Sequence, residues 1–416
     1  MPQEPLASPV GNKSGRTLSR ILAHPPTWAV LIVCAVALSL RRAGAVTNPQ
    51  FWAEDSYFFE NAYEYGWHAF TIPFAGYLHT LLRAIGMIAA SIDPAHARWT
   101  YLFCSFAVTL YVASRAVSER SPLPRFCGAA ALTVVLVPDT YEVLLNVVNL
   151  QWLIGGCLVL LLISGDPVNP RQWIHDLVSA VAMGLTGPFS IVLLPLFLIR
   201  AWVRRTRASA WLAAAVGVCA LIQEYLVITQ PPIGAAKPGF RIAYELLLPA
   251  VGRRVGGSVL VGSLLSPDTD QVIGTLVGLA TLLGIGLLAW LPGKHRLERA
   301  LLGLAFLGLL GGSFYRLRYG IDRFFIPTYA SRYFYIPQLI LMWLLLAAAE
   351  VKGLAGRVAP ALFACSLLVN LPRYRESAYL VNTRWSVYEP YIREGKPIVV
   401  PINPPGWIMP LPARKP

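Results

Sequence analysis

The chain has 416 residues, of which 56% are hydrophobic and only 13% are charged, whereas soluble domains typically carry about 25% charged residues. This composition, with a mean hydropathy of +0.56, argues against a soluble protein and predicts an integral membrane protein. The net charge of +14 does not predict nucleic-acid binding, because basic membrane proteins use Lys and Arg for topology and for anionic lipids, and no RNA-binding motif occurs.

The first apolar segment, at about 26–41, resembles the hydrophobic region of a signal peptide. The small-residue triplet 43–45 that follows even resembles a cleavage site. However, Arg41 and Arg42 stand directly before the triplet and argue against cleavage. We therefore interpret this segment as an uncleaved first span, preceded by a cytoplasmic tail, 1–25.

Ten further apolar runs follow, several of them short. They lie at about 97–117, 126–138, 149–164, 174–187, 188–201, 210–229, 271–291, 300–314, 333–350 and 358–371. A spanning helix needs roughly 20 mostly apolar residues. The run 76–92 carries His79 and Arg83 mid-run, so we interpret it as an interfacial helix. The sequence thus predicts an all-α fold, a polytopic transmembrane helix bundle of about 11 spans.

Five short loops rich in Arg and Lys support this interpretation, because it places all of them on one side of the membrane. They are 115–125, 165–173, 200–209, 292–299 and 350–357. The positive-inside rule makes that side cytoplasmic. The bundle, 26–371, then has outer loops 43–96, 230–270 and 315–332, and the tail 372–416 is also outside. We expect these outer pieces to form ordered loops or short interfacial helices. If 76–92 spanned instead, the basic loops would fall on the wrong side.

Six cysteines give no sign of a disulfide framework or a zinc site. They are Cys34, Cys104, Cys127, Cys157, Cys219 and Cys365. All lie inside or at the ends of apolar runs, and none forms a CxxC pair. We interpret them as small apolar core residues.

An acidic pair, Glu54 and Asp55, follows the first span among aromatic residues. Charge near a bilayer is costly and therefore tends to be functional. One of the two could act as a general base or orient an acceptor hydroxyl or amine. Alternatively, the pair caps an interfacial helix that begins near Ser56, because carboxylates favour a helix N-terminus.

A second acidic cluster, Asp139 and Glu142, follows the third span on the predicted outer side. Asn149 and Trp152 come next, as the chain returns to the membrane. Together with the first loop, this cluster could complete a cavity lined by carboxylates, with His79 and Arg83 in its wall. The alternative is a solvent-exposed turn followed by an interfacial belt.

Arginines on the predicted outer side oppose the topological preference and therefore suggest a binding role. They are Arg316, Arg318, Arg323 and Arg332, interleaved with aromatic residues. A guanidinium group matches the geometry of a phosphate, so we expect them to hold a lipid phosphate, with Arg332 as the main ligand. Arg41 and Arg42 could join this site. Alternatively, these arginines contact lipid headgroups non-specifically or pair with Asp322 and Glu389.

The order of these features resembles the GT-C superfamily of integral-membrane glycosyltransferases, which includes protein O-mannosyltransferases and the lipid A aminoarabinose transferase. Glu54-Asp55 is similar to the acidic motif after the first span, and 73–77 to the segment that returns to the membrane. Asp139 or Glu142 occupies the place of the second carboxylate. The resemblance extends through about residue 200. Many relatives have Asp-Glu where this chain has Glu-Asp, so either carboxylate could be the active one.

The resemblance implies an inverting transferase that uses a polyprenyl-phosphate sugar donor and a glycan, lipid or protein acceptor at the outer face of the bacterial cytoplasmic membrane. The outer arginines would hold the phosphate, and Glu54 or Asp55 would orient the acceptor. No cofactor is expected, although paired carboxylates could share a divalent metal ion. Alternatives are a transporter or flippase for lipid-linked saccharides, a polysaccharide polymerase or ligase, and a non-catalytic membrane subunit.

Overall fold

The computed structural model describes residues 26–230, 244–262, 271–318, 320–326, 329–375 and 381–414. The chain is mostly helical, with one small β-hairpin in the described part. The predicted N-terminal tail, 1–25, lies outside the described residues, as do parts of the loops 230–270 and 315–332.

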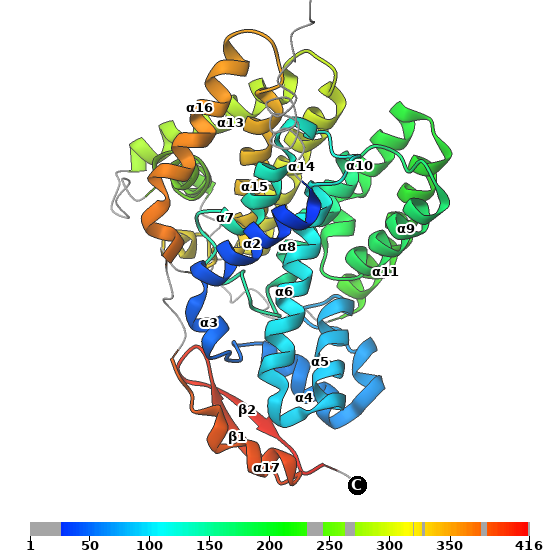
Figure 1. The fold of residues 1–416 in the computed structure, drawn as a ribbon, viewed down its shortest axis with the longest axis vertical. Helices are drawn as coiled ribbons and strands as arrows, with labels where there is room; N and C mark the ends of the chain where they lie inside the picture. Colours follow the sequence, from blue (N-terminus) through cyan, green and yellow to red (C-terminus); the bar gives the residue numbers. More distant parts are fainter. Residues whose placement is uncertain are drawn as a thin grey trace, which may run out of the picture.

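Each apolar segment predicted from the sequence corresponds to one helix. These helices are α2 (Thr27–Arg41), α6 (Ala97–Ala116), α7 (Cys127–Leu136), α8 (Leu150–Ile163), α9 (Pro170–Gly184), α10 (Phe189–Arg204), α11 (Arg207–Thr229), α13 (Gln271–Trp290), α14 (Arg296–Arg316), α15 (Arg332–Ala348) and α16 (Leu354–Val369). Helices α8 and α15 are buried almost all round, as expected for apolar helices at the centre of a bundle. Figure 1 shows the other helices arranged around these two.

Among the described residues, three helices are long and apolar enough to cross a membrane by length and composition: α11, α13 and α14. Several shorter apolar helices accompany them, among them α2, α7, α8, α15 and α16. At 1.5 Å per residue, a helix as short as α7 reaches only about 15 Å, half of a hydrocarbon core. The fold therefore indicates a membrane protein, and the count of about 11 spans stays a prediction.

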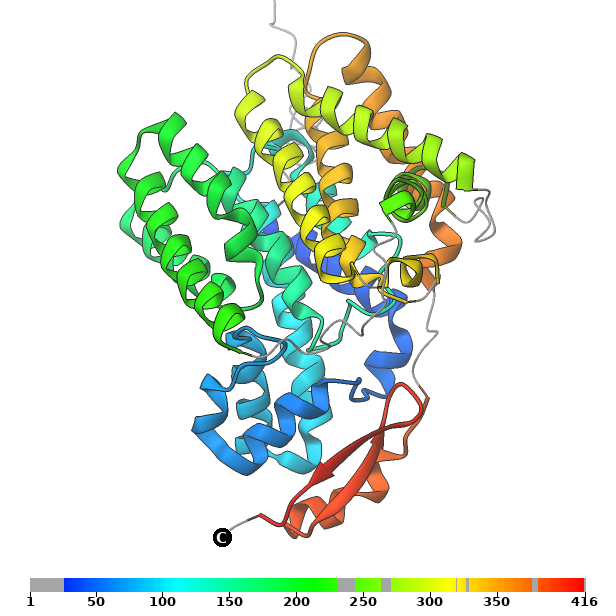
Figure 2. The same ribbon diagram turned by 180° about the vertical axis from the view of Figure 1, so that it is seen from behind.

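The remaining elements are short. They are α3 (Ala43–Thr47), α4 (Asp55–Tyr65), η1 (Gly66–Thr71), α5 (Thr80–Ile92), η2 (Pro94–His96), η3 (Pro124–Phe126), η4 (Tyr244–Leu246), α12 (Leu247–Val251), η5 (Gly252–Val261), η7 (Ile321–Phe325), η8 (Leu371–Arg375), η9 (Trp385–Val387), α17 (Glu389–Arg393), β1 (Ile398–Ile402) and β2 (Trp407–Leu411). Most of the first outer loop and of the tail forms a compact cap below the bundle, containing α4, α5, α17 and the hairpin (Figures 1 and 2).

The first outer loop and the tail hold this cap together. The backbone N–H of Asn403 donates to the carbonyl of Phe51 at 3.1 Å, and the indole N–H of Trp385 donates to the carbonyl of Ala95 at 2.7 Å. The rings of Phe51 and Trp385 lie 4.9 Å apart. The two segments, which the sequence placed on the same side of the membrane, thus form one structural unit.

The tail contains an antiparallel hairpin, which the expectation of loops and interfacial helices missed. Strand β1 pairs with β2 from Ile398 opposite Leu411 to Ile402 opposite Trp407. Alternate residues on one face are buried, including Val400 and Met409. Prolines in and around these short strands obscure this alternation in the sequence, since proline is uncommon in strands.

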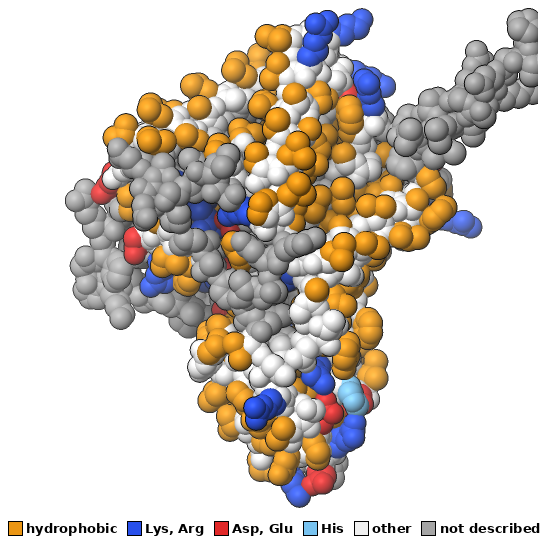
Figure 3. Space-filling view, turned by 60° about the vertical axis from the view of Figure 1, so that its left-hand side comes forward, with side chains coloured by type: hydrophobic (Ala, Val, Ile, Leu, Met, Phe, Trp, Pro, Cys, Tyr) orange, Lys and Arg blue, Asp and Glu red, His pale blue; other side chains and the backbone are white. Residues whose placement is uncertain are grey.

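The basic loops lie together at the end of the bundle that is opposite to the cap. Arg120 accepts a backbone hydrogen bond from Gly165 at 2.8 Å, and Arg204 pairs with Glu298 at 2.8 Å. The N–H of Arg125 donates to Glu350 at 3.4 Å. Figure 3 shows a mainly hydrophobic surface on the helical part, with Lys and Arg at its upper edge and mixed charges on the cap.

The predicted outer loop 230–270 contains a buried helical segment, α12 followed by the π-helix η5, that packs along α13. We expected only ordered loops or short interfacial helices there, because glycines and two arginines dilute the apolar character of this buried segment. Gly252 on this segment approaches the backbone of α13 at Gly274 and Gly278, and Gly256 approaches the side chain of Thr281. Small residues four apart allow two helix backbones to come close in this way. A Cβ at Gly278 would collide with the carbonyl of Leu248.

This close approach predicts different effects for two glycines of the same helix. We expect Gly278→Ala to lower stability by about 1–3 kcal/mol, because backbone atoms leave no space for the methyl group. Gly284 has open space beside it, so Gly284→Ala is expected to be neutral or to stabilise the protein, since alanine is the better helix former. Thermal unfolding of both variants in detergent measures the difference. Equal melting temperatures would contradict the close packing.

Candidate functional site

The main candidate site is a cavity of about 380 Å³ between the cap and the bundle. Its wall on the cap side comes from the N-terminus of α4 and the segment 74–77. Helices α8, α10, α11, α14 and α15 form the rest. Its volume lies in the range of ligand pockets, roughly 300–1,000 Å³. The charged side chains that line it are Glu54, Glu224, Arg316 and Arg332.

Glu54 lies at the cap side of this cavity. It occupies the N-cap position of α4, but its side chain caps no backbone N–H. Within the described part of the chain, its carboxylate has no hydrogen bond or ion pair, although its charge acts on Arg332 and Tyr77. The helix-capping alternative is therefore not seen for this side chain, and Glu54 is available to a ligand.

Arg332 lies at the start of α15 and faces both the cavity and a buried carboxylate. Its Nη1 donates to Oε2 of Glu142 at 2.9 Å. Its guanidinium carbon lies 5.4 Å from the centre of the Tyr333 ring. Burial raises the pKa of Glu142, and the charge of Arg332 opposes this shift. Arg316, at the end of α14, is exposed and lines the same cavity. The two arginines thus bring positive charge to one wall.

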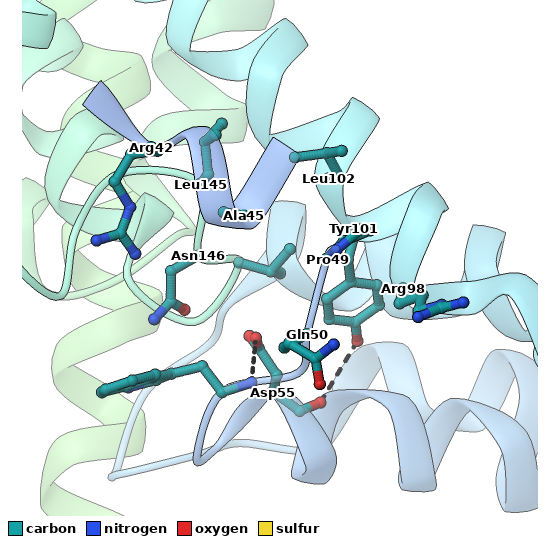
Figure 4. Close-up of a pocket in the computed structure, with 12 residues that line it drawn as sticks. Arg42, Ala45, Pro49, Gln50, Asp55, Arg98, Tyr101, Leu102, Leu145 and Asn146 are labelled. Atoms are coloured by element: carbon teal, nitrogen blue, oxygen red, sulfur yellow. Dashed lines mark hydrogen bonds between the residues drawn. The ribbon is translucent and has the colours of Figure 1, made fainter. Parts of the chain in front are cut away.

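Asp55 points away from this cavity and toward a second one of only about 20 Å³, shown in Figure 4. Its Oδ1 accepts the N–H of Val148 at 2.7 Å and its Oδ2 accepts that of Trp52 at 3.1 Å. The Tyr101 hydroxyl donates to the Asp55 carbonyl at 3.4 Å. Both carboxyl oxygens are thus engaged by backbone groups. Asp55 ties the start of α4 to the segment 137–149.

Asp139 lies in a buried polar cluster behind the cavity. Its Oδ2 pairs with Arg254 at 2.9 Å, and its backbone N–H donates to Gln338 at 3.3 Å. Asp139 and Glu142 are both almost fully buried, so they do not form the solvent-exposed turn that the sequence left open. They are not among the residues lining the 380 Å³ cavity.

His79 and Arg83 lie in the packing of the cap and outside the lining of this cavity. His79 precedes α5, stacks on Tyr77 at 4.8 Å and is 1% exposed. Burial lowers the pKa of His79 to about 3, so the imidazole is neutral. The Arg83 guanidinium donates to the carbonyl of Ile72 at 2.9 Å and lies over the ring of Tyr57 at 4.9 Å.

Asn149 and Trp152 are among the residues that line this cavity. The Asn149 amide donates to the carbonyl of Glu142 at 2.8 Å. Trp152 packs edge-on against Phe189 and Tyr333, at 5.3 and 4.9 Å. These contacts give the cavity a rigid aromatic wall.

The other predicted arginines lie elsewhere. Arg318 stacks on Tyr315 at 4.3 Å, and exposed Arg323 lies 5.9 Å from the ring of Tyr329. Arg42 is buried beside the small cavity and donates to the carbonyl of Tyr141 at 3.3 Å. Arg41 donates to the carbonyl of Pro138 at 3.1 Å. Glu389, offered by the sequence as an alternative partner for the outer arginines, instead pairs with Arg98 at 3.2 Å.

Sequence reasoning missed Glu224, which lines the cavity from α11. The signal was present, since an ionisable residue inside a long apolar helix is by default a functional candidate. Because the segment 210–229 is otherwise mainly apolar, we interpreted it only as a membrane span and gave Glu224 no role. Across the described ranges, no group of three or more His, Cys, Asp or Glu residues is placed to hold a metal ion.

No family model matches the chain, and no curated protein matches it significantly.

The surroundings of Asp55 predict a pH effect on stability. Burial raises the pKa of its carboxyl to about 8, against the lowering effect of its two backbone donors; an unfolded Asp titrates near 3.9. At a pH between these two pKa values, the folded state therefore keeps a proton on Asp55 that the unfolded state has released. Its contribution to stability is fully present below pH 4 and is lost as the pH rises toward 8, by at most about 1.4 kcal/mol per pH unit.

Unfolding of the wild type and of Asp55→Asn, compared at pH 5.5 and pH 7.5, tests this effect. We expect the wild type to lose more stability over this interval, since the amide does not titrate. Identical pH slopes in the two proteins would show that Asp55 keeps an ordinary pKa.

Proposed function

We propose that the protein is a membrane glycosyltransferase that moves a sugar from a polyprenyl-phosphate carrier to an acceptor. This proposal rests on the combination of two arginines, Arg316 and Arg332, with Glu54 in one cavity. The Glu54 carboxylate has no hydrogen bond or ion pair to any residue that the structure describes. The cavity lies where the cap meets the helices of a bundle with candidate membrane spans.

The composition of the walls suits a lipid-linked donor. Val192 of α10, Val227 of α11 and Leu309 of α14 give the cavity an apolar side, next to which a prenyl chain would lie. A guanidinium group pairs well with phosphate oxygens. Arg316 has no salt bridge to the described acidic residues, whereas one side of Arg332 is engaged by Glu142. We therefore assign the main phosphate contact to Arg316, with Arg332 supporting it.

The reaction is a single displacement at the anomeric carbon. The acceptor oxygen or nitrogen loses its proton to Glu54 and forms the new glycosidic bond. The bond between the anomeric carbon and the phosphate oxygen breaks, and its electron pair leaves with the lipid phosphate. Arg316 and Arg332 stabilise the charge that develops there. Attack on the face opposite to the leaving group inverts the configuration.

The charge distribution supports an outer location for this reaction. The cavity adjoins the cap, whereas the basic loops lie at the opposite end of the bundle. If the positive-inside rule holds, the basic end faces the cytoplasm and the cavity opens toward the outer face of a bacterial cytoplasmic membrane. The N-terminus is then cytoplasmic and the tail is outside.

The test is transfer from a panel of radiolabelled polyprenyl-phosphate sugars to membrane glycan and lipid acceptors by purified protein. We expect Glu54→Gln to reduce turnover at least about 100-fold, as for loss of a general base, with donor binding retained. Arg316→Ala should weaken donor binding. Arg332→Ala is a poorer probe, because it would leave Glu142 buried without its partner.

Matched controls are Glu64→Gln, at the far end of α4, and Arg171→Ala, an exposed arginine at the basic end. Both should behave like the wild type. If folded wild-type protein binds a donor but never turns it over, a transporter for lipid-linked saccharides becomes the better explanation. If it neither binds nor turns over any donor, the glycosyltransferase proposal is wrong.

A further inference from the structure

Glu224 is the charged group of the cavity that the mechanism above does not use. It belongs to α11, one of the three helices long and apolar enough to cross a membrane, and lies five residues, about 7.5 Å, before the end of that helix. A carboxylate facing hydrocarbon is costly, so an acidic residue on such a helix normally faces a polar site. Here that site is the 380 Å³ cavity, which Glu224 lines as an exposed side chain.

The residues beside Glu224 fix its direction. Gln223 is fully buried, and its amide donates to the carbonyls of Leu78 and Gly187 at 3.2 and 3.1 Å. Its Oε1 accepts the N–H of Leu78 at 2.8 Å. Tyr225, on the other side, lines a different, apolar cavity of about 550 Å³. The clamp at Gln223 therefore holds α11 in the register that places Glu224 at the polar cavity.

Within the part of the chain that the structure describes, the Glu224 carboxylate has no hydrogen bond or salt bridge. A phosphate would be repelled by this carboxylate and would go to the arginines. A cation would be repelled by Arg316 and Arg332 in the same cavity. Uncharged hydroxyl groups avoid both conflicts, and a carboxylate accepts hydrogen bonds from them strongly.

We propose that Glu224 binds hydroxyl groups of the sugar that is transferred, and that it thereby sets donor specificity. This inference rests on the proposed glycosyltransferase function. It divides the two carboxylates of the cavity between two tasks. Glu54, from the cap, acts on the acceptor, and Glu224, from the bundle, holds the donor sugar beside the arginines.

The test is steady-state kinetics of Glu224→Gln with a donor that the wild type uses. Loss of a hydrogen bond to a charged acceptor should raise KM for the donor about 10- to 100-fold, while kcat changes less than about threefold. Glu224→Asp, which keeps the charge, should recover part of the affinity and provides a second variant. Tyr225→Phe is the matched control and should leave both constants unchanged.

Deoxy analogues of the donor separate direct binding from a structural effect. Removing the hydroxyl that Glu224 contacts should weaken binding to the wild type but not further weaken binding to Glu224→Gln. An unchanged KM in both Glu224 variants, or additive effects of variant and every deoxy analogue, would overturn this inference and leave the transferase proposal standing. Absence of turnover in the folded wild type would overturn both.

Discussion

The pairing of buried charge where the cap joins the bundle is the constraint on which the rest of the structure depends. The segment 137–149 carries Asp139 and Glu142 into a nearly water-free region, where an unpaired charge would be costly. Arg254 and Arg332 pair with them, at 2.9 Å in each case. Asp55 joins the same segment to α4 through a backbone N–H. These contacts fix α15, η5 and the cap relative to one another, next to the 380 Å³ cavity.

The candidate site differs from its surroundings because some of its carboxylates are not paired with an arginine or a backbone donor among the described residues. Nearby carboxylates are engaged by arginines or backbone donors, whereas half-buried Glu54 and exposed Glu224 line the cavity without a hydrogen bond or salt bridge to the described residues. An arrangement that satisfies most buried charges but leaves two carboxylates facing a cavity is typical of a ligand site. The aromatic wall at Trp152 and the clamp at Gln223 keep the cavity open between rigid helices, which limits reorganisation when a ligand binds.

Hydropathy alone predicted the main helices, because each is a continuous apolar run. It did not predict α12 and η5, whose packing depends on Gly252 and Gly278 meeting across sequence-distant backbones. The sequence also left open which of Glu54 and Asp55 is the active carboxylate. In the structure only Glu54 lines the 380 Å³ cavity, because successive helical residues point in different directions. The partners of Asp139 and Glu142 lie more than 100 residues away, and no local pattern specifies such pairs. Arg332, which we expected to be the main phosphate ligand, lines the cavity and also pairs with Glu142.

The contact between Phe51 and Asn403 has a consequence for biosynthesis. Residue 51 leaves the ribosome long before residue 403 exists; at 5–20 residues per second, the ~350 residues between them take roughly 20–70 s to translate. During that time α4 lacks the hairpin that packs on it, and Phe51 lacks Trp385. The cap wall that carries Glu54 is therefore completed last. A nascent chain halted before the hairpin would have an assembled bundle but an incomplete wall of the 380 Å³ cavity.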